Sequence, residues 1–391
     1  MGLAPFLRAS LSGSDLRALG QQILEEAGRN TSDAEQWMNL STVVQCFGQR
    51  DLGLAIQALA LDKKRIYHLA ASRQPAKSRL LMLSVPGDIS ANTPLDCLLE
   101  NSDVDLIYYY VLPDDPLALP IPEHDALFVA ICESDENRGI LAMLEQALAH
   151  WPKPVINKPQ YIPATGREAA SRLLQDAPGV LIPPTLQAPR SALLDIAAGD
   201  IRLSGRFPGC EFPIIVRPVG SHAGRNLERM EHPGELAAYL AKVEDAELFV
   251  SPFIDYSGKD GRFRKFRIAL IDGEPYACHM GVSSHWMVHY VNAGMYEDAG
   301  KREEEAAFME HFDDFAHRHR AALDAIHQRT RLDYLCIDCA ETRDGKLMIF
   351  EIDHTMVVHA MDPEQLFPYK RFHMQKVQDA FRNYLFRLTM A

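Results

Sequence analysis

The sequence predicts a protein of mixed class: an N-terminal helical segment, then an α/β domain with a parallel sheet, then an α+β domain. Three observations predict it. Apolar residues recur at helical spacing in residues 1–76, apolar strands alternate with helices in residues 77–159, and residues 160–391 contain strand pairs joined by Asp-Gly turns. A chain of 391 residues is long enough for these parts to form separate domains.

Composition and charge narrow the class of protein. Apolar residues make up 47% of the chain and charged residues 24%, which is ordinary for a globular protein. The net charge of −13 argues against a nucleic acid or an anionic membrane as the main partner. The 7 cysteines are irregularly spaced, which argues against a secreted disulfide framework, and no apolar run is long enough for a membrane span. We therefore expect a cytoplasmic protein.

The pattern of residues 1–76 predicts helices near 15–26, 32–47 and 51–61. Ser32 and Glu35 are expected to form a capping box at the start of the second helix. The residues at packing positions are Trp37, Leu40, Gly48, Ala60 and Leu61. This spacing resembles one tetratricopeptide repeat, which would imply contact with a protein or peptide. A helical cap packed on the next domain remains open as the alternative, because such repeats normally need neighbours to bury their faces.

Residues 77–159 predict a parallel sheet. Strands are expected at 80–85, 104–112, 126–132 and 154–156, with helices at 93–99 and 137–150. Unbroken apolar strands separated by helices are typical of a parallel sheet covered on both faces. No G-x-G-x-x-G follows the first strand, so a dinucleotide site is not predicted, although the strand ends could hold a substrate.

Residues 160–391 predict two antiparallel hairpins, with turns at Asp272-Gly273 and Asp344-Gly345. The expected strands are 213–217, 247–253, 264–271, 274–282, 333–341 and 346–353, and a charged helix is expected at 303–328. This domain therefore differs in class from the preceding one.

The second hairpin carries a candidate metal site. If Asp344-Gly345 forms a two-residue turn, Asp338 lies opposite Glu351, and Asp353 shares the face of Glu351 while Phe350 and Ile352 face the core. Three carboxylates on one patch need a positive partner, and their oxygens suit Mg²⁺. A solvated acidic face is the alternative.

Cationic side chains on two other strands could hold phosphates. Arg217 ends a strand that leads into a Gly-rich loop containing Gly220, Ser221 and Gly224, and such loops bring backbone amides close to phosphate. Lys265 and Arg267 share a strand face. The alternative for the loop after Arg217 is a plain turn. The alternative for Lys265 and Arg267 is a solvated edge strand.

The order of these features resembles the ATP-grasp enzymes, in particular the branch that contains glutathione synthetase and the ribosomal-protein glutamyl ligases. The resemblance covers about residues 80–355 and implies an ATP-grasp fold preceded by a pre-ATP-grasp domain. It implies ATP and Mg²⁺ as cofactors, with Asp338, Glu351 and Asp353 as metal ligands, although Asp353 stands where the family usually has Asn.

The resemblance also implies roles around the nucleotide. Arg167 and Arg217 occupy the places of phosphate-binding lysines, and Arg267 matches an arginine that contacts the reacting group, so Arg267 and Arg217 are the candidate catalytic residues. Residues 248–253 match the hinge that binds adenine. The candidate ATP-binding residues are Arg167, Arg217, Gly220, Ser221, Gly224, Val250, Ser251, Phe253 and Lys265.

The stretch after the first hairpin is where such enzymes usually bind the acceptor. Its candidate substrate residues are Ser283, Ser284, His285, Trp286, His289 and Tyr290. On a helix, His285 and His289 would share a face and could ligate a metal. No third ligand is evident, so we expect substrate contact or packing instead.

The function implied by the resemblance is ATP-dependent ligation of a carboxylate and an amine, from small molecules or peptides, through an acylphosphate. Two other functions stay open at this point: a grasp-type phosphotransferase, and a non-catalytic nucleotide-binding adaptor. The sequence also leaves a homodimer open.

Overall fold

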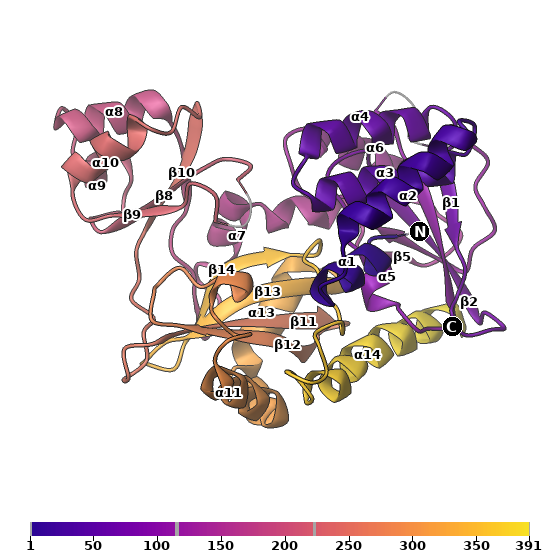
Figure 1. The fold of residues 1–391 in the computed structure, drawn as a ribbon. Helices are drawn as coiled ribbons and strands as arrows, with labels where there is room; N and C mark the ends of the chain where they lie inside the picture. Colours follow the sequence, from indigo (N-terminus) through magenta and orange to yellow (C-terminus); the bar gives the residue numbers. More distant parts are fainter. Residues whose placement is uncertain (1, 114–116, 222–223, 391) are drawn as a thin grey trace.

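The computed structural model describes residues 2–113, 117–221 and 224–390. Figure 1 shows a sheet domain with the N-terminal helices on one side, a second sheet in the middle, and a smaller lobe beyond it. The helical segment, the parallel sheet and the antiparallel sheets follow one another in the predicted order, so the predicted fold class is confirmed. In the described ranges, no helix combines the length and apolarity needed to cross a membrane.

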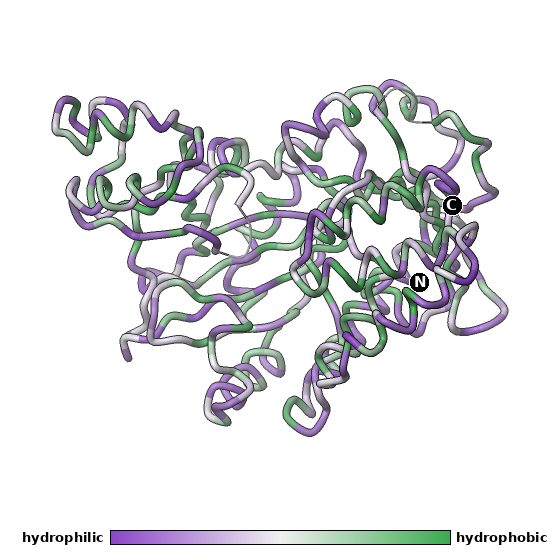
Figure 2. The backbone as a smooth tube through the Cα atoms, turned by 45° about the horizontal axis from the view of Figure 1, so that its top comes forward, coloured by the Kyte–Doolittle hydropathy of each residue, from purple (hydrophilic) through white to green (hydrophobic). Residues whose placement is uncertain are grey.

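Four helices form the N-terminal segment: α1 (Ala4–Leu11), α2 (Leu16–Arg29), α3 (Ala34–Cys46) and α4 (Arg50–Leu61). The predicted capping box is wrong, because Asp33 caps α3 and its carboxylate accepts the N–H groups of Glu35 and Gln36. Along the tube in Figure 2, hydrophilic and hydrophobic stretches alternate in the helices, as expected when one helix face packs on a core.

These helices cap the neighbouring sheet. Met38 of α3 and Ala60 of α4 are buried in one cluster with Tyr67, and Tyr108 and Tyr110 pack against that cluster from the sheet. This contact favours the cap over a free-standing repeat, because the apolar helix face is covered by the next domain.

The first sheet has the strand order β1-β3-β2-β4-β5. Its strands are β1 (Ile66–Leu69), β2 (Ser78–Ser84), β3 (Val104–Tyr110), β4 (Ala126–Val129) and β5 (Val155–Ile156), with helices α5 (Leu95–Leu98) and α6 (Arg138–Leu148). Strands β2 to β5 are parallel, as predicted. Strand β1 was not predicted; it pairs antiparallel with β3, although its residues fell in the expected helical segment.

A smaller lobe contains the antiparallel sheet β7-β10-β8-β9. Its elements are β7 (Leu186–Pro189), β8 (Ile214–Pro218), β9 (Glu228–Met230), β10 (Glu247–Pro252), α8 (Arg190–Ala198), α9 (Leu203–Arg206) and α10 (Pro233–Leu240). Buried residues from helices and strands form a core of its own, including Leu193, Val216, Leu236 and Leu248. The 3-10 helix η1 (Pro159–Thr165) and helix α7 (Arg167–Leu174) precede this lobe in the chain.

The third sheet has the order β12-β11-β13-β14-β6. Its strands are β6 (Val180–Leu181), β11 (Phe263–Ile271), β12 (Glu274–Ser283), β13 (Tyr334–Glu341) and β14 (Leu347–Asp353). The single predicted helix over 303–328 is wrong: the chain forms α11 (Ala299–Glu310), α12 (Phe312–Arg318) and α13 (Arg320–Thr330), interrupted at His311 and His319. Helix α14 (Lys370–Met390) links this sheet to the first domain, where Arg382 pairs with Asp103 at 2.5 Å.

The two hairpin turns differ. Asp272 and Gly273 both have positive φ, 54° and 79°, and form the predicted two-residue turn. The second turn was predicted wrongly, because the N–H of Thr342 bonds to the carbonyl of Lys346 and three residues lie between them.

A bulge on β14 restores the predicted register despite that extra turn residue. Cys339 pairs with Ile349 but Asp338 pairs with Glu351, so Phe350 is the unpaired residue. The Phe350 ring packs on Tyr256, with ring centroids 4.8 Å apart, and not in the main core with Ile352 as predicted. Asp338 therefore faces Glu351 because two local deviations cancel.

Candidate active site

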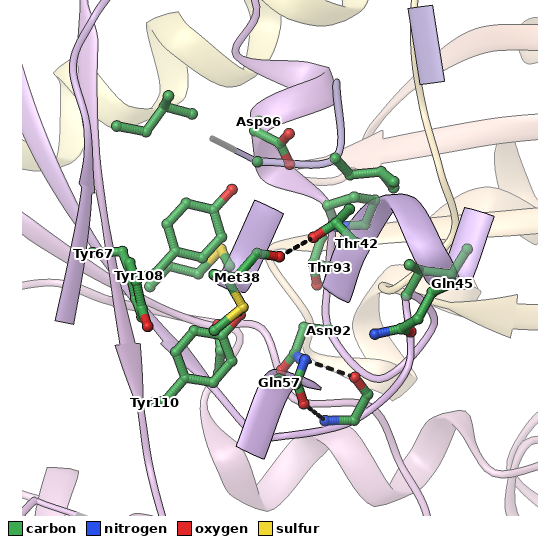
Figure 3. Close-up of a pocket in the computed structure, with 18 of the residues that line it drawn as sticks. Met38, Thr42, Gln45, Gln57, Tyr67, Asn92, Thr93, Asp96, Tyr108 and Tyr110 are labelled. Carbon is green, nitrogen blue, oxygen red and sulfur yellow. Dashed lines mark hydrogen bonds between the residues drawn. The ribbon is translucent and has the colours of Figure 1, made fainter. Parts of the chain in front are cut away.

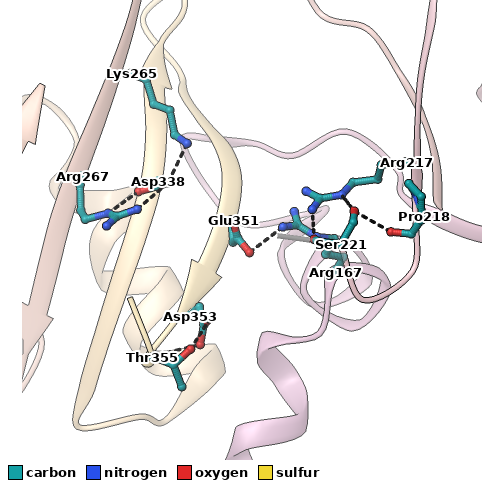
Figure 4. Close-up of polar contacts among 10 residues, drawn as sticks. All are labelled: Arg167, Arg217, Pro218, Ser221, Lys265, Arg267, Asp338, Glu351, Asp353 and Thr355. Carbon is teal, nitrogen blue, oxygen red and sulfur yellow. Dashed lines mark hydrogen bonds and ion pairs between the residues drawn. The ribbon is translucent and has the colours of Figure 1, made fainter. Parts of the chain in front are cut away.

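One row of polar side chains crosses four neighbouring strands of the third sheet. Arg267 on β11 is the register partner of His279 on β12 and of Asp338 on β13, and Asp338 is in turn the partner of Glu351 on β14. Residues paired in this way lie on the same face of a sheet. The neighbouring acids are thus accompanied by a cation in the same row (Figure 4).

Asp338 is held between two cations. Its side chain is 3% exposed, and its carboxylate oxygens lie 2.8 Å from Arg267 Nε and 2.7 Å from Lys265 Nζ. Burial raises the pKa of Asp338, but Arg267 and Lys265 outweigh burial and hold that pKa well below its ordinary value. The edge-strand alternative for Lys265 and Arg267 is wrong, since β11 is paired on both sides.

Glu351 is paired with a cation from another element. Arg167 is the first residue of α7, and its Nη2 lies 2.6 Å from Glu351 Oε1. Burial raises the pKa of Glu351, whereas Arg167 lowers it, and the net shift is downward. Before Arg167, a Cβ on Gly166 would lie 3.0 Å from the Glu133 carboxylate, so the start of α7 packs closely against the first domain.

Asp353 is engaged locally. Its two oxygens accept the backbone N–H of Thr355 at 2.9 Å and the Thr355 hydroxyl at 2.7 Å. The neighbouring His354 is fully buried and contacts the carbonyl of Ile131 at 3.0 Å, which ties the end of β14 to the segment after β4. Asp353 therefore points to its own turn (Figure 4).

The three predicted metal ligands do not converge. Within the described ranges, no group of three or more His, Cys, Asp or Glu side chains lies close enough to hold a metal ion. Strand alternation fixed the face of Asp338, Glu351 and Asp353, but a different partner draws each side chain in its own direction. The Asp338–Glu351 pairing is confirmed, and these two carboxylates remain a fitting donor set, because Mg²⁺ commonly binds one or two carboxylates plus substrate phosphates. Metal binding by the three acids stays a prediction.

Arg217 is positioned by its own loop. It is 9% exposed on β8, its Nε donates to the Ser221 hydroxyl at 3.0 Å, and its Nη2 donates to the Ser221 carbonyl. The Ser221 hydroxyl donates to the carbonyl of Pro218 at 2.8 Å. Burial, followed by the nearby charge of Arg167, lowers the pKa of Arg217 to about 10. Arg217 and Arg167 thus bring positive charge together from the small lobe and from α7.

The Gly-rich loop contacts the candidate acceptor segment. Gly220 and Gly224 have φ values of 71° and 74°, a conformation that favours glycine. His222 and Ala223, which lie between Ser221 and Gly224 in the predicted loop, are outside the described residues. A Cβ on Gly224 would lie 3.3 Å from Met287 Sδ, so the described end of the loop packs on residues 283–290.

The candidate adenine hinge is largely taken up by sheet pairing. Val250 on β10 pairs with Leu186 of β7 on one side and with Val216 of β8 on the other. The pairing with β7 ends at Val250, so the β7 side of Ser251 is the more open part of the strand. The Phe253 ring contacts Trp286, with centroids 5.7 Å apart. Adenine binding at Val250, Ser251 and Phe253 stays a prediction.

The acceptor segment is not helical through its histidines. A single 3-10 turn, η2 (Tyr290–Asn292), follows them, so the helical spacing of His285 and His289 does not apply. The N–H of His285 bonds to the Ser283 hydroxyl at 3.0 Å, and Ser284 and His285 are exposed. Burial and then Lys265 lower the pKa of the half-buried His289. Substrate contact by these residues stays a prediction.

Tyr290 belongs to a buried polar network that the sequence analysis missed. Its hydroxyl donates to Glu305 Oε2 at 2.9 Å, and its ring lies 4.6 Å from that of His279. Glu305 is fully buried with Lys370 Nζ 3.4 Å from its other oxygen. Glu305 looks like one more acid in a charged helix, so only its position in three dimensions reveals it.

Comparisons with known proteins find only distant structural similarity. No protein-family model matches the sequence, and no curated protein is similar to it. A solved structure of D-alanyl-alanine synthetase A from Vibrio cholerae is 14% identical, with a TM-score of 0.48, over 81% of this chain and 99% of that one. D-alanine–D-alanine ligase from Bacillus anthracis complexed with ATP is 14% identical, with a TM-score of 0.46, over 80% and 98%. A RimK domain ATP-grasp protein from Sphaerobacter thermophilus is 14% identical, with a TM-score of 0.43, over 79% and 100%. At these values no residue role or activity transfers to this chain.

Proposed function

We propose that this protein is an ATP-dependent ligase that joins a carboxylate to an amine through an acylphosphate. The observation that carries the proposal is the pair Asp338 and Glu351, in direct register and neutralised by cations from separate elements. A triphosphate with its metal needs this combination of hard oxygen donors and mobile positive charge.

Nucleotide binding would exchange the partners of these ion pairs. Phosphate oxygens bind guanidinium and ammonium groups at least as well as carboxylates do. Arg167 would turn from Glu351 to the phosphates beside Arg217, and Lys265 would turn from Asp338. Glu351, and the Asp338 lone pairs that Lys265 leaves while Arg267 stays bound, would then be open to hold Mg²⁺, with Asp353 joining them after leaving Thr355. The metal would supply neutralisation of the phosphate charge.

The remaining residues would align the reactants. Arg267 would stabilise the charge that develops when the substrate carboxylate attacks the γ-phosphate, and an amine would then displace phosphate to form the amide. The acceptor segment 283–290 is supported as the amine site by two contacts: Met287 lies beside Gly224, and Trp286 lies beside Phe253. It would thus border both the Gly-rich loop and the hinge.

One observation favours the adaptor instead. Each of the three carboxylates already has a partner, so the described site is stable in itself and does not need a nucleotide. No observation specifically favours a phosphotransferase.

The proposal is tested by following ADP release and product formation while amino acids and dipeptides are supplied. Amine-dependent ADP release with an amide product supports the ligase. A phosphorylated carboxylate without amide would replace it by the phosphotransferase, and no turnover with any pair of substrates would leave the adaptor.

A further inference from the structure

A second site lies far along the chain from the charged row, where the N-terminal helices cover the first sheet. A partly open cavity of about 110 Å³ is lined by α3, α4, the strands β1 to β3 and the loop after β2 (Figure 3). Two of its lining residues, Ser84 and Tyr110, are the last residues of β2 and β3. The carboxyl ends of parallel strands are where ligands of such sheets commonly bind.

The walls of the cavity are aromatic and apolar on one side. Tyr67, Tyr108 and Tyr110 line it together with Met38 and Met82. The rings of Tyr67 and Tyr110 meet edge to face with centroids 6.0 Å apart. Several aromatic faces around one small space favour a ligand with an apolar body and, through cation–π attraction, a positive charge.

Three buried oxygen atoms in the lining have no hydrogen-bond partner among the described residues: Ser84 Oγ, Gln45 Oε1 and Tyr108 Oη. Ser84 is 0% exposed and Gln45 is 8% exposed. The Gln45 amide nitrogen donates to the Ser41 hydroxyl at 3.1 Å, which fixes the amide with its oxygen unpaired. All three unpaired atoms can accept a hydrogen bond, and Gln45 Oε1 can only accept one, so the cavity has a place for a donor.

The charge of the lining is negative. Asp88 and Asp96 are its acidic residues, and no Lys or Arg is among the described residues that line it. Because Asp88 is paired with Arg50 at 2.8 Å outside the lining, Asp96 is the main source of negative charge. Asp96 is 5% exposed and accepts the N–H of Ala4 at 2.6 Å, and burial raises the pKa of its carboxyl. A cation in the cavity would stabilise the charged form of Asp96.

One wall is fixed in advance. The side-chain amide of Gln57 on α4 bonds to both backbone groups of Gly87, at 2.8 and 3.0 Å (Figure 3). The loop after β2 is therefore clamped to α4, and a ligand would not have to order it.

We propose that this cavity binds a small primary ammonium compound, with its N–H groups on Gln45 Oε1 and Ser84 Oγ and its apolar body among the tyrosines. The site is independent of the nucleotide chemistry proposed above. A ligand there would touch helices and sheet together and would strengthen the contact between them.

The test compares a primary amine with a neutral molecule of the same shape on the full chain. Isobutylamine and isobutanol are titrated by calorimetry and by saturation-transfer NMR. The amine is expected to bind at least about tenfold more tightly, because hydrogen bonds from a charged donor are the stronger ones. Equal affinity, or no binding of either, would mean that water fills the cavity and would overturn the proposal.

A matched pair of serines on β2 separates binding from folding. Ser84→Ala is expected to weaken isobutylamine binding about tenfold. Ser78→Ala is the control, because Ser78 Oγ is also buried without a partner among the described residues but does not line the cavity. An equal effect of the two substitutions on amine affinity would contradict the assignment.

Discussion

The two polar regions of this protein differ in whether their buried polar side chains have partners. In the row on the third sheet, Asp338 and Glu351 are each neutralised by a cation, and Asp353 is bonded to Thr355. In the N-terminal cavity, Gln45 and Ser84 keep buried oxygen atoms without a partner among the described side chains. The first arrangement can take a charged ligand only by exchanging partners, whereas the second can take one by addition.

The largest effect is expected on the free energy of unfolding, when the buried Asp338 loses its charge. Asp338→Asn would leave Arg267 and Lys265 without their shared anion, and loss of one partner of a buried pair costs about 3–5 kcal/mol of unfolding free energy. Urea unfolding measures it. Asp176→Asn on the exposed surface serves as the control and should leave the unfolding midpoint unchanged. A stability loss no greater than the control's would show that Asp338 is not held as described.

The next effect is on activity. Glu351→Gln is nearly isosteric and removes the charge that the proposed metal needs, so ATP hydrolysis is expected to fall at least about 100-fold. The Arg167–Glu351 pair is partly exposed, and its loss should cost no more than about 1 kcal/mol of stability. Turnover at the wild-type rate would eliminate Glu351 from the site.

A third prediction concerns the stability of the fold at low pH. At the turn end of β13, hydrogen bonds from His319 and Arg318 lower the pKa of Glu341 to about 2, against burial, which raises it. Its contribution to stability is present above the unfolded pKa and is lost as the pH falls from there towards about 2. Glu341→Gln should flatten the unfolding free energy over this acid range, while Glu145→Gln on the exposed face of α6 should not. Parallel pH curves for wild type and Glu341→Gln would contradict this.

The smallest effect is expected in the N-terminal helices, where the caps of α2 and α3 can be removed separately. Asp33→Ala removes the cap of α3, and Asp15→Ala removes that of α2; each should cost about 1 kcal/mol. Of α2 and α3, only α3 contributes described residues to the cavity lining: Met38, Thr42 and Gln45. Asp33→Ala should therefore weaken isobutylamine binding, and Asp15→Ala should not. Calorimetry measures both affinities, and an equal effect of the two substitutions would contradict the proposed binding site.

Patterns within one strand or one turn were predictable from the sequence. The Asp272-Gly273 turn formed as expected, whereas the predicted pairing of Asp338 with Glu351 rested on a two-residue turn at Asp344-Gly345 that does not form. The register held although the second turn did not, because the bulge at Phe350 compensated for it. Such a compensating bulge cannot be predicted from residue spacing alone.

Features that depend on distant contacts were not predictable. Strands β6, β7 and β9 span only two to four residues, which is too short for a periodic signal. The directions of Asp338 and Glu351 were set by partners far away in the chain, such as Arg167 for Glu351. The same is true of Glu305, whose partners Tyr290 and Lys370 come from other elements.

The most direct test of the central claim is the affinity for ATP with Mg²⁺ and with the metal chelated. If Asp338 and Glu351 exchange their cations for a metal that arrives with the nucleotide, ATP should bind at least about tenfold more tightly with Mg²⁺, and Glu351→Gln should abolish the difference. Equal affinity with and without Mg²⁺ in the wild-type protein, or no binding of ATP at all, would contradict it.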